Sequence, residues 1–304
     1  MIQYDPHRWL HHFFDLKGSM VREIVGRMLV STVWAVGVVA FHRYVRPVDI
    51  PSTVHGLVGV ALGLLLVFRT NSSYDRFWEG RKLWGGIVNE TRNLARAAGV
   101  FLRERDPELY RTLVRWTAVF PSSAASGLRG VRNLGPIAAQ LPPGDVQQVA
   151  AAQHATLAVA WRMSEALAEG RRRGYYNEYT QMALDQNVQL LIDYVGGCER
   201  IHRTPMPFAY MVHLRRALVL YCYSLPFALV DSFGWLAVVA TFLVSYVFLG
   251  IEEIGVEIED PFGVDENDLP LEQICGVIHA NLLALLPPET SQSPGVPEKV
   301  AQSQ

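Results

Sequence analysis

One uninterrupted stretch, residues 54–100, constrains what this chain can fold into more than any other. Its first fifteen residues, from Val54 to Phe68, carry no charge if His55 is neutral, whereas from Arg69 onward charged side chains recur every few residues. No proline interrupts the stretch, so we predict a single helix, about 70 Å long at ~1.5 Å per residue. Because the hydrocarbon core of a bilayer is ~30 Å thick, such a helix would begin in a membrane and continue into water.

The composition fits a protein that is partly in the membrane and partly soluble. Of 304 residues, 50% are hydrophobic and 18% are charged, against about 25% charged in soluble domains. The net charge of −2 gives no electrostatic argument for binding nucleic acid. The three cysteines form no CxxC pair, so we expect the soluble part to face a reducing cytoplasm.

Charge and hydropathy divide the chain into six segments. We expect an amphipathic N-terminal segment (1–22), a first membrane hairpin (23–68), a helical cytosolic region (69–207), a second hairpin linked at 231–233 (208–251), an acidic loop with a helix (252–286) and a disordered tail (287–304). No alternating β pattern appears, so the predicted fold is all-α with four transmembrane helices. Four spans place both termini on one side. The arginines of 69–207 indicate that this side is the cytoplasm.

Three bulky apolar residues of the long helix, Val60, Leu64 and Phe68, recur every four positions and form one narrow stripe. Small residues lie close by, and Gly59 and Gly63 have the spacing that lets helix backbones approach closely in lipid; the set is Gly56, Gly59 and Gly63. This pattern has two interpretations. It is typical of ordinary packing within one subunit, and it also fits the inner wall of a symmetric bundle whose apolar constriction gates by dewetting.

The other notable cluster is acidic and follows the last predicted span, from Glu252 to Asp268. Oxygen-rich loops bind hard cations such as calcium, although this one lacks the EF-hand spacing, and a solvated acidic loop is the alternative. We find no GxSxG, HExxH, Walker or GxGxxG motif. The sequence therefore gives no reason to expect an enzyme.

Three stretches together resemble the bacterial bestrophin family in order and spacing: FRTNSSYDRFWEGRKLWGGIVNETRNLAR, GGCERIHRTPMPFAY and IEDPFGVDENDLPLEQIC. The resemblance covers nearly the whole chain from Trp9 to Leu286. It implies a homopentameric ion channel in the lipid bilayer, with four membrane spans and a cytosolic vestibule in each subunit. It also places the rings of the channel's hydrophobic neck on Val60, Leu64 and Phe68. A second, cytosolic constriction would fall at Tyr179, with Glu178 adjacent.

The same resemblance bears on calcium. Animal bestrophins carry a calcium clasp around the PFG motif, and Asp260, Asp265 and Asp268 match its oxygen-bearing positions, with Glu257 close by. Val264 and Asn267 interrupt the acidic run. No cofactor is therefore required, and calcium stays an open alternative.

We expect passive conduction of monovalent ions, with a slight preference for chloride because Arg and Lys crowd the cytosolic half of the long helix. One alternative is a sodium-selective channel of the same fold. Another is a membrane scaffold or ligand-binding protein that does not conduct.

Overall fold

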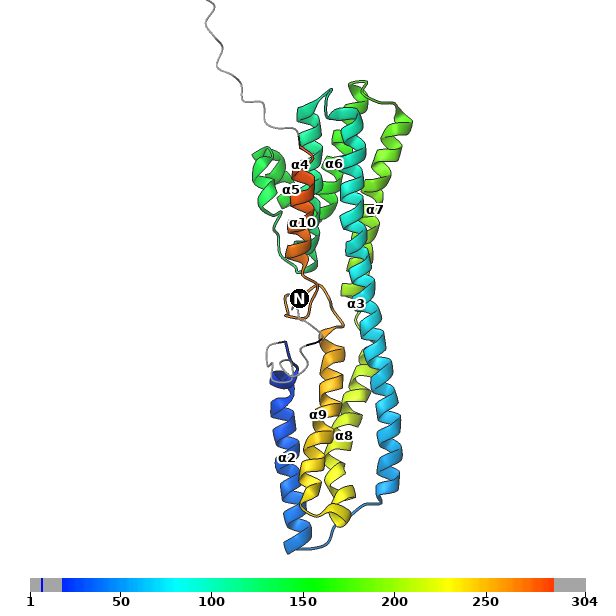
Figure 1. The fold of residues 1–304 in the computed structure, drawn as a ribbon, viewed down its shortest axis with the longest axis vertical. Helices are drawn as coiled ribbons and strands as arrows, with labels where there is room; N and C mark the ends of the chain where they lie inside the picture. Colours follow the sequence, from blue (N-terminus) through cyan, green and yellow to red (C-terminus); the bar gives the residue numbers. More distant parts are fainter. Residues whose placement is uncertain (1–6, 8–17, 287–304) are drawn as a thin grey trace, which may run out of the picture. The chain divides into compact units, whose positions relative to one another are not determined.

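The computed structural model describes residue 7 and residues 18–286, and all the regular elements of these residues are helical (Figure 1). The predicted tail 287–304 and most of the predicted segment 1–22 lie outside the described residues. The prediction of an all-α fold is confirmed. The elements are α2 (Val21–Tyr44), α3 (Ser52–Leu102), α4 (Pro107–Leu128), the 3-10 helix η1 (Pro136–Gln140), α5 (Pro143–Ala151), α6 (Ala155–Arg172), α7 (Glu178–Arg203), α8 (Phe208–Phe233), α9 (Leu236–Glu257) and α10 (Leu271–Leu283).

The long helix predicted from the sequence is α3, which has 51 residues. It begins directly after Pro51 and continues to Leu102 without an internal proline. At ~1.5 Å per residue it is about 76 Å long. A single helix thus carries both the apolar stripe and the charged continuation.

Three of the described helices, α2, α3 and α9, are long and apolar enough to cross a membrane. The predicted fourth span corresponds to α8, which does not reach the same hydropathy because His213, Arg215 and Arg216 occupy its first turns. The link between α8 and α9 also differs from the sequence prediction. Residues 231–233 belong to α8, and the chain reverses at Gly234, whose φ of 53° suits a residue without a Cβ.

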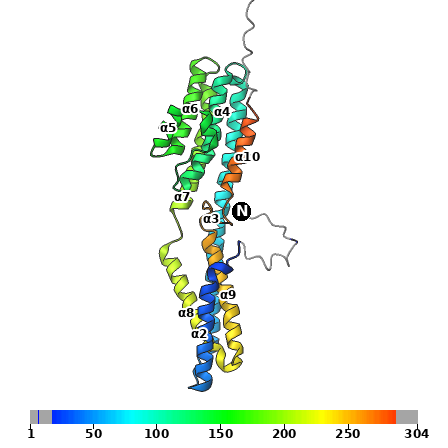
Figure 2. The same cartoon turned by 90° about the vertical axis from the view of Figure 1, so that its left-hand side faces the viewer.

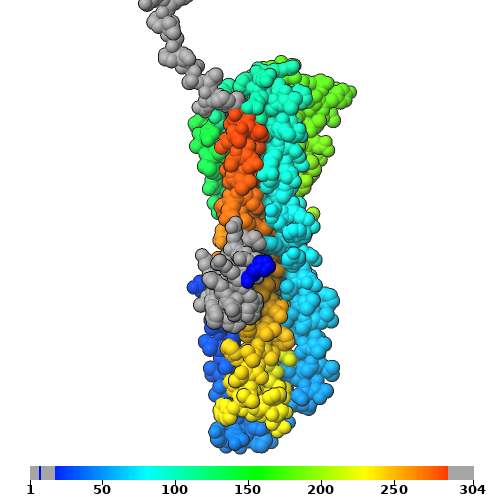
Figure 3. Space-filling model, in the orientation of Figure 1, coloured from blue at the N-terminus to red at the C-terminus, as the bar shows by residue number. Residues whose placement is uncertain are grey.

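The described residues form two compact units, one made of residues 18–88, 124–131 and 191–274, and the other of residues 89–123, 132–190 and 275–286. In the first unit, α2, α8, α9 and the first half of α3 run side by side (Figures 1 and 2). Polar contacts join the helices: Ser31 and Ser245 are hydrogen-bonded at 3.0 Å, and Trp34 Nε1 donates to the carbonyl of Tyr223 at 2.9 Å. The outer side of α9 reaches the surface of the molecule (Figure 3).

The second unit contains the end of α3 (residues 89–102), most of α4 and α10, the first half of α7, and α5 and α6. Its core includes Leu113, Trp116 and Phe120 of α4, all almost fully enclosed. Asp106 begins α4 as an N-cap: its side chain accepts a hydrogen bond from Leu109 N–H at 3.1 Å, and Pro107 follows in the first helical position.

Candidate pore helix and acidic cavity

The apolar stripe of α3 points away from the rest of its own chain. Val60, Leu64 and Phe68 are 74%, 56% and 57% exposed, whereas Leu62 and Leu66, two positions away, are 2% and 1% exposed. Leu57, Val58 and Val67 of the same helix are exposed too, and a contiguous apolar surface of this kind indicates contact with lipid, with another copy of the chain or with an apolar passage.

The opposite face of α3 is held on α8. Leu62 and Leu66 pack against Leu214 and Leu218 of α8. The start of α3 is fixed by His55, whose Nε2 lies 3.2 Å from the carbonyl of Tyr221 and 3.1 Å from Ser224 Oγ; the rings of His55 and Tyr221 are 4.1 Å apart. These contacts hold the beginning of α3 against α8, on the side away from the stripe.

The structure separates the three glycines singled out from the sequence. A Cβ at Gly59 would lie 2.5 Å from the hydroxyl of Tyr221, so this glycine makes room for α8 within the same chain. A Cβ at Gly56 or Gly63 would meet nothing within 4 Å. Gly59 thus matches the interpretation of packing within one subunit, and the other two leave open space beside the stripe.

An ion pair between Arg69 and Glu259 lies next to the stripe and was not predicted from the sequence. Arg69 directly follows Phe68 but is only 1% exposed, and its Nη2 donates to Glu259 Oε2 at 2.8 Å. The signal was present in the sequence, because residue 69 continues the face formed by Leu62 and Leu66 at helical spacing. The partner could not be identified in the same way, since it lies 190 residues away.

Tyr179 and Glu178, expected at a cytosolic constriction, both lie exposed in the first turn of α7. The turn is capped by Asn177, whose side-chain oxygen accepts a hydrogen bond from Thr180 N–H at 2.9 Å. The helix start is therefore well defined, and its aromatic and acidic side chains are free to line an opening.

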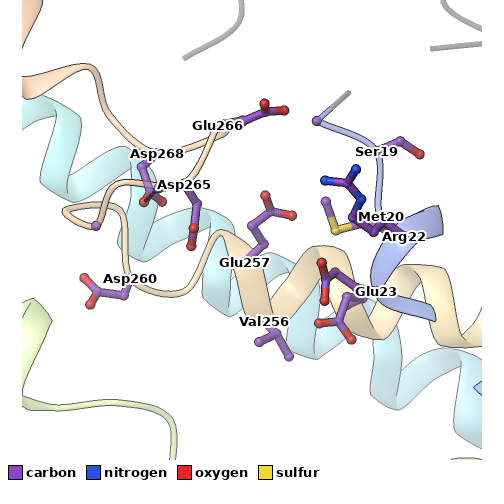
Figure 4. A pocket seen from close by; sticks show the side chains of 13 residues that line it. Ser19, Met20, Arg22, Glu23, Val256, Glu257, Asp260, Asp265, Glu266 and Asp268 are labelled. Carbon is purple, nitrogen blue, oxygen red and sulfur yellow. Dashed lines mark hydrogen bonds between the residues drawn. The ribbon is translucent and has the colours of Figure 1, made fainter. Parts of the chain in front are cut away.

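The residues proposed for calcium gather around one cavity of about 970 Å³ in the first unit (Figure 4). Glu257 comes from the end of α9, and Asp260, Asp265 and Asp268 come from the loop between α9 and α10 (residues 258–270, here called the acidic loop). The start of α2 completes the lining with Arg22 and Glu23, among others. Sequence reasoning thus identified side chains that the fold brings together.

Several of these carboxylates are already engaged within the chain. Among residues 7 and 18–286, no three His, Cys, Asp or Glu side chains are placed to hold one metal ion. Asn267 Nδ2 donates to Glu257 Oε1 at 2.9 Å and to the carbonyl of Gly18 at 3.1 Å, so an amide already binds these oxygens. Asp268 Oδ2 accepts from Asp265 N–H at 2.7 Å. Burial raises the pKa of Asp268 to about 6, and the neighbouring carboxylates of Asp265, Asp260 and Glu257 raise it too, against the lowering effect of that hydrogen bond.

Comparison with known proteins agrees with the sequence resemblance. The family model for bacterial and fungal bestrophin proteins matches residues 1–284. The voltage-dependent anion channel-forming protein alr2987 of Nostoc sp. is 38% identical over 291 residues, which cover 95% of this chain and 94% of that protein. YneE of Escherichia coli K12, which has the same description, is 32% identical over 287 residues, covering 94% of each chain.

The fold is also similar to solved structures. A crystal structure of a bacterial bestrophin homologue from Klebsiella pneumoniae superposes with a TM-score of 0.80 at 30% sequence identity, covering 86% of this chain and 98% of that one.

Proposed function

Because this chain belongs to the bacterial and fungal bestrophin family, we propose that it forms a membrane channel that conducts anions passively. The observation that carries the proposal is the exposed apolar stripe of α3. Val60, Leu64 and Phe68 are bulky and uncharged, and each is more than half exposed on its own chain, as the wall of a hydrophobic neck requires. The names of the relatives, which describe anion channel-forming proteins, support the choice of ion.

In this proposal α8 is the fourth membrane span. Its second half packs with both neighbouring spans: Val230 of α8 forms one cluster with Val39 of α2 and Ala237 of α9. Its basic first turns would lie at the membrane surface, where Arg215 Nε donates to Glu252 Oε1 at 2.9 Å. With four spans both termini are cytoplasmic, in the inner membrane.

The subunits would assemble as a symmetric homopentamer, with five copies of the stripe meeting around the axis. Gly56 and Gly63, which have open space around them, would let the neighbouring helix approach. A ring of apolar side chains can close to ions by losing its water without any charged gate. The exposed first turn of α7, with Glu178 and Tyr179, would line the second, cytosolic constriction.

Charges beyond the neck would favour anions, although fewer of them are available than the sequence predicts. Arg69 is enclosed and paired, and Arg76 donates to the backbone carbonyls of residues 201, 204 and 259. Arg81, Lys82 and Arg96 are exposed and are among the residues that can supply positive charge. A sodium-selective pore of the same shape is the alternative. No cofactor is required in this proposal, and calcium at the acidic cavity would act on regulation only.

Single-channel recording in planar bilayers tests the proposal. The purified protein should give discrete current steps, and replacing all three stripe residues with Ala should enlarge the conductance or abolish closure. Absence of steps under any ion gradient would favour a scaffold or ligand-binding protein. Steps that are unchanged in the triple variant would mean that the neck lies elsewhere.

A further inference from the structure

The enclosed face of α3 changes character just past the stripe. Leu62 and Leu66 of this face pack against apolar side chains of α8, but its next two members, Arg69 and Ser73, are polar and are 1% and 0% exposed. The spacing of these four residues follows the period of an α-helix. A charged side chain is almost never fully enclosed unless it is paired. The partner of Arg69 therefore decides whether this face can stay packed.

Arg69 depends on a single partner. Its Nη2 donates to Glu259 Oε2, while its Nε and Nη1 are enclosed and have no hydrogen-bond partner among the described residues. The hydroxyl of Ser73, one turn further on, is likewise enclosed without a partner in this part of the chain. Removing Glu259 would leave a buried cation uncompensated, which is strongly unfavourable. The position of Arg69 thus depends on Glu259.

Glu259 is itself fixed from two other directions. Its Oε1 accepts a hydrogen bond from the backbone N–H of Met206 at 2.7 Å, in the link between α7 and α8. Its backbone carbonyl accepts from Nε of Arg76, two turns beyond Arg69 on α3, at 2.9 Å. This residue, the second of the acidic loop, therefore holds α3 at two points and is anchored to the link before α8.

We propose that Glu259, acting through Arg69, is the positioning residue that sets the rotation of α3 at the stripe. Successive residues of a helix differ in direction by ~100°, so a fixed Arg69 also fixes the direction of Phe68, its immediate neighbour. The acidic loop is thereby connected mechanically to the narrowest part of the pore. In calling that part the neck, the inference rests on the proposed function.

Gly255 offers a way to disturb the same contact without changing any charge. It lies on α9 beside Arg69, and a Cβ at this position would be 3.2 Å from Arg69 Cγ and 3.5 Å from Nε. Such a contact is tight for an enclosed side chain that has little room to move. Gly255→Ala should therefore shift Arg69 and reproduce the effect of weakening its ion pair.

The experiment measures the rate at which a thiol reagent modifies Phe68→Cys in the otherwise intact protein. The three native cysteines are buried and supply little background. Glu259→Gln and Gly255→Ala should each change this rate at least about threefold, the size of coupling expected between residues in one network. Glu272→Gln is the matched control, because it removes the Arg129–Glu272 ion pair, in which α3 takes no part. Its rate should equal that of the parent.

A second position separates local rotation from general loosening. Val100→Cys lies on the same helix and is exposed, so its rate should not respond to Glu259→Gln. Equal changes at both positions, or no change at Phe68→Cys, would overturn the inference. The modification rate can be measured without any channel current. Absence of channel steps would therefore refute the proposed function, and the modification rates would still test the positioning role of Glu259.

Where currents are present, open probability gives an independent measurement. Glu259→Gln should alter the open probability in the parent channel and have no further effect in a Phe68→Ala background, since the side chain that it positions is then missing. Additive effects of the two substitutions would contradict action through the neck.

Discussion

Leu64 and Leu66 of α3 are chemically identical and two positions apart, and truncating each of them should have opposite consequences. Leu66 is 1% exposed and packs against Leu214 and Leu218 of α8. In lipid or detergent the surroundings are as apolar as the protein interior, so the loss in Leu66→Ala consists of the cavity and the missing contacts. That places its cost near the lower end of the usual range for a buried Leu, at about 2 kcal/mol.

Leu64 is 56% exposed, so Leu64→Ala leaves no cavity within the chain and should change the free energy of unfolding by less than about 0.5 kcal/mol. If the side chain faces the pore axis, the same change widens the neck in every subunit and raises the single-channel conductance. Two assays on the same preparation decide the matter: thermal unfolding in detergent and recording in planar bilayers. Equal destabilisation by both substitutions with unaltered conductance would show that the stripe packs between helices and does not line a pore.

Three other predictions concern residues outside the apolar spans. The pKa of Asp106 is lowered, because hydrogen bonds from Leu109 N–H, Arg173 and Tyr175 outweigh the opposing effect of burial; its stabilising contribution is therefore present above the ordinary Asp range and is lost as the pH falls below about 4. Asn also caps a helix well, so Asp106→Asn removes mainly the ion pair with Arg173; it should lower the free energy of unfolding by about 0.5–1 kcal/mol at pH 7, and the difference from the parent should shrink in melts at pH 3. Burial, together with the carboxylates of Glu199 and Glu79, raises the pKa of the Cys198 thiol to about 12. Mass spectrometry should therefore find this thiol unmodified by thiol reagents until the protein is denatured. Calcium added after chelation should leave the melting temperature unchanged, because the acidic side chains of the cavity do not converge on one point; a clear rise would support the calcium site.

Much of the architecture follows from local patterns that a sequence displays directly. The extent of α3 is set by the absence of proline and by the change from apolar to charged residues at Arg69. The stripe could be recognised because Val60, Leu64 and Phe68 recur at the helical period. The sequence predicted which carboxylates line the acidic cavity, since most of them lie within residues 253–268.

The parts that could not be predicted depend on residues far apart in the chain. A charged residue is expected at the surface, so burial of Arg69 becomes reasonable only once Glu259 is seen beside it. The contact from Asn267 to the carbonyl of Gly18, which changes the interpretation of the acidic cavity, joins residues 249 positions apart. The predicted end of α8 was wrong for a different reason. Residues 231–233 are compatible with a helix, and the chain turns only at Gly234, which permits a positive φ.

The central claim is that the α3 stripe forms the neck of a pore that passes anions, and a reversal potential tests it most directly. In a tenfold gradient of potassium chloride an ideally selective pore reverses about 59 mV from zero, with a sign set by the permeant ion. We predict a shift toward the chloride equilibrium potential, together with an increase in conductance in the Ala variants of Val60, Leu64 and Phe68. A shift toward the potassium equilibrium potential, or no channel current at all, would contradict the account.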